Sequence, residues 1–119
     1  MIDKTTKMKA KVEDFDKIIK SATAVAKEHA ITQHGSDIMI YPCGFAWVKI
    51  KPARGKFVSY LKEREIGSTD PYKGGYQFSP YSIGVNFNQS YYHKVAFAKK
   101  FAEVLQTYGI NATVEAMLD

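Results

Sequence analysis

The chain has 119 residues, 45% of them hydrophobic, and a formal net charge of +5. This size and composition predict one globular domain, residues 1–119, that buries enough surface to need neither a disulfide nor a metal ion for stability. The single cysteine excludes an intramolecular disulfide, and the charged residues 1–11 form neither a signal peptide nor a membrane span. We therefore expect a cytoplasmic protein without a membrane partner, with residues 1–11 frayed.

The first predicted element is an amphipathic helix over residues 12–30. Its apolar residues recur at intervals of three and four, and acidic residues fall in its first turn, where the helix dipole favours negative charge. A short strand is predicted over residues 38–41. It ends at Pro42, which has no amide hydrogen for a strand ladder, and residues 42–44 form a hairpin turn into the next strand.

The strand predicted over residues 45–50 is the one around which the domain is organised. Its alternating side chains divide between two faces, with Ala46, Val48 and Ile50 on one and Phe45, Trp47 and Lys49 on the other. Both faces begin with apolar residues. We therefore predict a central strand that helices cover on one face and that is partly covered on the other.

Two more helices are predicted. A short one runs from residue 57 to about residue 65, and Gly67 is expected to end it. The last helix begins after Ser90, whose hydroxyl can cap the first turn, and carries an apolar stripe as far as Tyr108. Gly109 then supplies the left-handed residue that closes many helices.

The remaining strands are less regular in sequence. Residues 68–89 contain several glycine and proline breakers, and we predict one or two strands there, near residues 75–78 and 82–87, separated at Pro80. Residues 112–118 alternate as a final strand.

The order of these elements is helix, strand, strand, helix, one or two strands, helix, strand. It predicts a two-layer α+β domain in which a mixed or antiparallel sheet of about four to five strands packs against helices. Such a sheet has an open edge, so a monomer and a homodimer both fit the sequence.

Several short motifs lie in residues 41–119. They are PCGFAWV at residues 42–48, Gly55 with Phe57, Leu61-Lys62, Gly74-Gly75-Tyr76, Gln89-Ser90, Gly109-Ile110-Asn111-Ala112 and Leu118-Asp119. Together they resemble a group of small hypothetical proteins encoded by tailed bacteriophages. The resemblance implies production inside an infected bacterium and carries no activity or functional residue with it.

Most of the excess positive charge lies in residues 49–73, which hold seven basic and three acidic residues. Within this stretch, the basic loop over residues 51–56 precedes a helix start, a place where backbone amides and the helix dipole favour anions. Arg54 can bind phosphate bidentately, and Lys51 and Lys56 add charge. The alternative interpretation is a solvated connection between strand and helix.

A tyrosine-rich segment follows, with seven aromatic residues between Tyr72 and Tyr92 among glycine, serine, asparagine and lysine. Such a composition can form a stacking platform for nucleic acid or a surface that binds protein. We expect about half of these rings to fill the core. The others are candidates for ligand contact, together with one lysine: Tyr72, Lys73, Tyr76 and Tyr81.

Catalytic and metal signatures are weak. Cys43 can act as a nucleophile only with a neighbouring base, and no spacing pairs it with a histidine, so a buried structural thiol is the favoured interpretation. No two histidines or cysteines have the spacing of zinc ligands. We expect no metal and no cofactor.

The sequence therefore favours a non-enzymatic phage accessory protein that binds nucleic acid or another phosphate-bearing ligand through the basic loop and the aromatic loop. The alternative is a protein that inhibits or modulates a host factor through the tyrosine-rich loop. A small enzyme that uses Cys43 is the third hypothesis. Salt separates the first two, because contacts to phosphate weaken steeply as salt rises.

Overall fold

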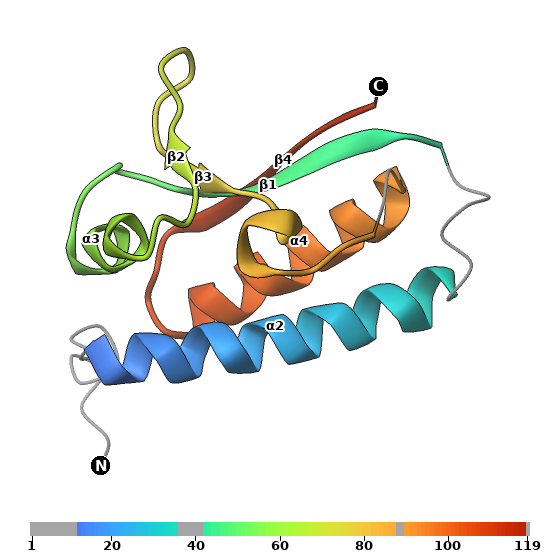
Figure 1. Ribbon diagram of the computed structural model, residues 1–119, viewed down its shortest axis with the longest axis horizontal. Helices are drawn as coiled ribbons and strands as arrows, with labels where there is room; N and C mark the ends of the chain where they lie inside the picture. The colour runs from blue at the N-terminus through green and yellow to red at the C-terminus, as the bar shows by residue number, and fades with distance from the viewer. Residues whose placement is uncertain (1–11, 36–41, 88–89, 119) are drawn as a thin grey trace.

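The structure is a computed structural model that describes residues 12–35, 42–87 and 90–118. Within these residues three α-helices, a 3₁₀ helix and four strands form an α+β domain, as predicted (Figure 1). In chain order they are α2 (Val12–His34), β1 (Gly44–Ile50), α3 (Lys56–Glu63), β2 (Ser68–Thr69), β3 (Tyr76–Phe78), η2 (Pro80–Ile83), α4 (Tyr91–Thr107) and β4 (Ala112–Leu118). The predicted strand 38–41 and the frayed segment 1–11 lie outside the described residues.

The four strands form one antiparallel sheet in the order β2-β3-β1-β4. β1 is central, as predicted, because it pairs with β3 on one side and with β4 on the other. Val48 lies opposite Phe78 of β3 and Val114 of β4. The prediction for the two faces of β1 is also confirmed. The face that begins with Ala46 is buried, whereas Phe45 on the other face is 39% exposed.

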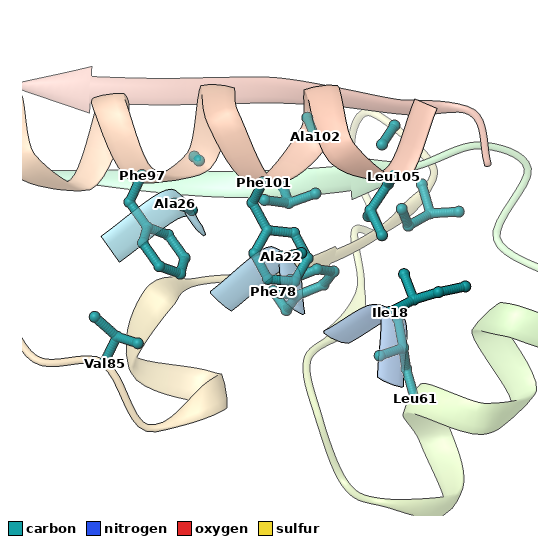
Figure 2. Packing of buried hydrophobic residues seen from close by; sticks show 14 of the residues in the cluster. Ile18, Ala22, Ala26, Leu61, Phe78, Val85, Phe97, Phe101, Ala102 and Leu105 are labelled. Atoms are coloured by element: carbon teal, nitrogen blue, oxygen red, sulfur yellow. The ribbon is translucent and has the colours of Figure 1, made fainter. Parts of the chain in front are cut away.

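The helices cover one face of the sheet. α4 lies against β1 and β4, and α2 packs on α4 (Figure 1). Figure 2 shows why α4 needs a wide apolar stripe: Ala102 points to the strands, and Phe97 and Phe101 point toward α2. The small side chains of Ala22 and Ala26 on α2 leave room for these rings, so that large and small residues interlock in a closely packed core.

Both long helices end at glycines with positive φ. α2 continues to His34, four residues beyond its predicted end, and Gly35 follows with φ 82°. The predicted cap of α4 is confirmed, since the hydroxyl of Ser90 accepts a hydrogen bond from the amide of His93. Gly109 follows α4 with φ 80°, as predicted.

The predicted end of the short helix is wrong. α3 stops at Glu63, and the first residue after it with a positive φ is Glu65, at 57°, two positions before Gly67. The amide of Ile66 then donates to the carbonyl of Leu61, which closes the helix. Gly67 has a different role, because its Cα lies against the carbonyl of Gln77 and leaves no room for a side chain.

The predicted strand over residues 82–87 is also wrong. Its first part forms η2, because Pro80 fixes a helical φ at the first position and Ser79 and Ser82 cap each other reciprocally. The apolar pattern that suggested a strand still marks burial, since Val85 and Phe87 lie in the core. The two-residue strand β2 was not predicted.

Candidate functional site

The loop that joins β1 to α3 presents three cationic side chains. Lys51, Arg54 and Lys56 are exposed, and none of them forms an ion pair in the part of the chain that the structure describes. Gly55 is the N-cap residue of α3 and has no side chain to bond the first amides of the helix. The loop thus combines free positive charge with the electropositive end of a helix, as the sequence predicted.

A second loop connects β2 to β3 and is held together by Asp70. One carboxylate oxygen of Asp70 accepts hydrogen bonds from the amides of Tyr72 (2.9 Å) and Lys73 (3.2 Å), and the other accepts from Lys49 Nζ (2.6 Å). The bond from Lys49, followed by those two amides, lowers the pKa of Asp70 to about 2. Asp70 is therefore ionised at neutral pH and orders the loop.

Lys49 ties this loop to the sheet. Its side chain is 3% exposed even though it lies on the face of β1 away from the helices. Its Nζ is 3.6 Å from a carboxylate oxygen of Glu115 on β4, and Lys73 Nζ is 3.1 Å from the other one. Two lysines and two acids therefore balance each other here. The charge of Lys73, a predicted ligand-binding residue, is already opposed by Glu115.

The two loops lie side by side. A Cβ placed on Gly75 would stand 3.0 Å from Cγ of Lys51, so the start of the basic loop packs against the end of the loop between β2 and β3. Tyr72, near the tip of that loop, is 94% exposed. We call residues 70–75 the Tyr72 loop; the fold thus brings Lys51 against a loop whose exposed tyrosine is twenty-one positions later in sequence.

Tyr76 does not join this surface. Its side chain is 2% exposed, and its hydroxyl donates to the carbonyl of Ile66 at 2.6 Å. The prediction that Tyr76 offers its ring to a ligand is wrong, because β3 turns this residue into the core beside Phe78. Burial also raises the pKa of Tyr76.

Tyr81 lies elsewhere, at a cleft of about 560 Å³ beside the first half of β1. We call this cleft the aromatic cleft; its lining includes Phe45, Trp47, Tyr81, Asn86, Phe87 and Lys94. Sequence reasoning missed it as a site. The one signal for it in the sequence was the alternation that places Phe45 and Trp47 on the less covered face of β1. The sequence could not show that η2 and Lys94 line the same cleft, because only the tertiary fold brings them there.

Cys43 is exposed and forms a β-bridge with Ser90, so the prediction that it is buried is wrong. The nearby His93 is fully buried, with Nδ1 2.6 Å from the Ser90 hydroxyl and Nε2 2.7 Å from the carbonyl of Gly35. A carbonyl can only accept, so Nε2 carries the hydrogen and Nδ1 accepts from Ser90. Both nitrogens are therefore occupied, and His93 does not activate Cys43.

Within residues 12–35, 42–87 and 90–118, no three His, Cys, Asp or Glu side chains gather as metal ligands. No helix in these ranges has the length and apolar character needed to cross a membrane. Comparison of the chain with protein-family models, with curated proteins and with solved structures found no match.

Proposed function

We propose that the protein binds nucleic acid, or another phosphate-bearing ligand, on the surface formed by the basic loop and the Tyr72 loop. Lys51, Arg54 and Lys56 bond phosphate oxygens, and Tyr72 provides an exposed ring for stacking. One observation carries this proposal: three exposed cations lack ion-pair partners among the described residues, and their loop begins against Gly75, in the same loop as a tyrosine that is 94% exposed.

The geometry favours a ligand with several phosphates over a single ion. The cations lie along an exposed loop, which suits a chain of negative charges that can follow the surface. Lys49 and Lys73 support the fold instead, because they face Asp70 and Glu115.

The test is the affinity of the protein for a labelled single-stranded oligonucleotide at low salt, measured by fluorescence anisotropy. Changing Arg54→Ala together with Lys56→Ala is expected to weaken binding about tenfold, which corresponds to two exposed ion pairs of about 0.7 kcal/mol each. The matched control is Lys17→Ala with Lys20→Ala, which removes the same charge from exposed positions of α2.

Equal affinity for the wild type and the Arg54/Lys56 variant would contradict the proposal. An equal loss in both double variants would mean that only net charge matters. If the oligonucleotide does not bind at all, a protein partner that contacts Tyr72 becomes the better account, and salt should then affect that complex little.

A further inference from the structure

The aromatic cleft has the features of a site for a flat ring. The rings of Phe45 and Trp47 lie nearly parallel, 5.9 Å apart, with 16° between their planes. Lys94 Nζ is 5.4 Å from the centre of the Phe45 ring and donates to the carbonyl of Gly44 at 2.9 Å. Tyr81 is 79% exposed and lines the same cleft. The volume of the aromatic cleft, about 560 Å³, lies in the usual range for small-molecule sites.

We propose that the aromatic cleft binds a nucleobase, which stacks on Trp47 and Tyr81 while polar side chains contact its edge. Asn86 can both donate and accept, and Lys94 can donate to a ring carbonyl or to the adjoining phosphate. This inference rests on the proposed function, since it names the part of a nucleic acid that a second site recognises. It adds recognition of the base to the phosphate contacts of the basic loop.

A base fits this cleft better than an added peptide strand. On the side of β1 that faces the cleft, only residues 44–47 lie between the Cys43–Ser90 bridge and the pairing of Val48 with Phe78. Lys94 already occupies the carbonyl of Gly44 there. The free stretch is therefore too short for the usual ladder of an added strand, whereas stacking needs only the ring faces.

The cleft and the basic loop lie at opposite ends of β1. From Trp47 to Lys51 the chain advances four residues, about 13 Å at the rise of a strand. This separation is short enough for one oligonucleotide to contact both sites, with a base in the cleft and phosphates on Lys51, Arg54 and Lys56.

Trp47 is the only tryptophan in the chain, so its fluorescence reports directly on the cleft. The experiment titrates the protein with adenosine and uridine monophosphates and with ribose 5-phosphate as the ligand without a base. The mononucleotides are expected to quench Trp47, and ribose 5-phosphate is not. Tyr81→Ala should weaken the nucleotide response roughly five- to 150-fold, the effect of losing one stacking partner.

Two controls separate the cleft from the rest of the protein. Tyr92→Ala removes an exposed ring outside the cleft, 43% exposed against 79% for Tyr81, and should leave the response unchanged. Arg54→Ala with Lys56→Ala should weaken the oligonucleotide but should not change the mononucleotide response. Circular dichroism of each variant checks that it is folded.

Three results would overturn the inference: no quenching by either mononucleotide, equal quenching by ribose 5-phosphate, or an unchanged response in Tyr81→Ala. The proposed function stands if the oligonucleotide still binds through Arg54 and Lys56 in those cases. The converse result is that mononucleotides quench Trp47 while the Arg54/Lys56 variant binds the oligonucleotide as tightly as the wild type. That result would reject the proposed role of the basic loop and support the cleft as a nucleobase site.

Discussion

Asp70 is the residue on which the geometry of the Tyr72 loop most depends. It bonds two backbone amides of that loop and the buried ammonium of Lys49 at once, so it joins the loop to the sheet. All three bonds favour the ionised carboxylate, which explains why the pKa of Asp70 falls from 3.8 to about 2.

This lowered pKa predicts a loss of stability in acid. A carboxyl whose pKa is lower in the folded state contributes stability above its ordinary pKa, and that contribution disappears as the pH falls through the folded value. The free energy of unfolding of the wild type should therefore exceed that of Asp70→Asn at neutral pH, and the difference should shrink between about pH 4 and pH 2. Urea unfolding at a series of pH values measures this difference.

The control is Glu28→Gln, at an exposed position of α2. A difference between the wild type and Asp70→Asn that does not depend on pH would contradict the role assigned to Asp70.

His93 makes a second polar link, between the end of α2 and the start of α4. His93→Leu fills the space but leaves the buried Ser90 hydroxyl without its acceptor, and we expect a loss of about 1–3 kcal/mol in the free energy of unfolding. His29→Leu, at a half-buried position of α2, should change it by less than about 0.5 kcal/mol. Equal effects of the two substitutions in urea unfolding would show that the hydrogen bonds of His93 do not stabilise the fold.

At the scale of elements, Gly67 tests how α3 is joined to β2. Gly67 and Gly84 have nearly the same φ, 79° and 85°, but of the two only Gly67 lies against other atoms. Gly84→Ala should therefore cost only the left-handed strain of about 1–2 kcal/mol. Gly67→Ala adds a collision with the carbonyl of Gln77, which should lower the free energy of unfolding by a further amount of about 1–3 kcal/mol. Thermal unfolding compares them, and similar losses would mean that the contact at Gly67 relaxes freely.

Periodicity predicted α2, α4, β1 and β4, and these elements are confirmed. Both long helices, the central strand and β4 have repeating apolar positions that local geometry alone interprets. Residues 68–87 were harder, because their apolar residues are buried without a regular repeat. The sequence around the buried rings of Tyr76 and Phe87 does not differ in pattern from that around the exposed rings of Tyr72 and Tyr81. The turns between them decide which rings face the core.

The candidate site was predicted only in part for the same reason. The basic loop lies within one stretch of sequence, so its three cations could be named in advance. The opposed charge of Lys73 depends on Glu115, which comes from a strand more than forty residues later. The aromatic cleft likewise joins β1, η2 and α4, which local patterns do not bring together.

At the scale of the whole molecule, the net charge of +5 does not show which cations a ligand can reach. Between residues 49 and 73, Lys49 and Lys73 face acids, and Arg64 lies over the ring of Tyr60 and near Asp16. Apart from Lys62, which lies 5.9 Å from the centre of the Tyr76 ring, the cations of this stretch without an ion pair among the described residues are those of the basic loop. The central claim is therefore that three cations, rather than the net charge, hold a nucleic acid.

The salt dependence of oligonucleotide affinity tests this claim most directly. For a single strand, three phosphate contacts predict a slope of about −2 in the plot of log K against log salt, and the one contact left in Arg54→Ala with Lys56→Ala predicts about −0.7. Lys17→Ala with Lys20→Ala should keep the wild-type slope. A slope that is the same in the wild type and the Arg54/Lys56 variant would contradict the account, because the phosphate contacts would then lie elsewhere.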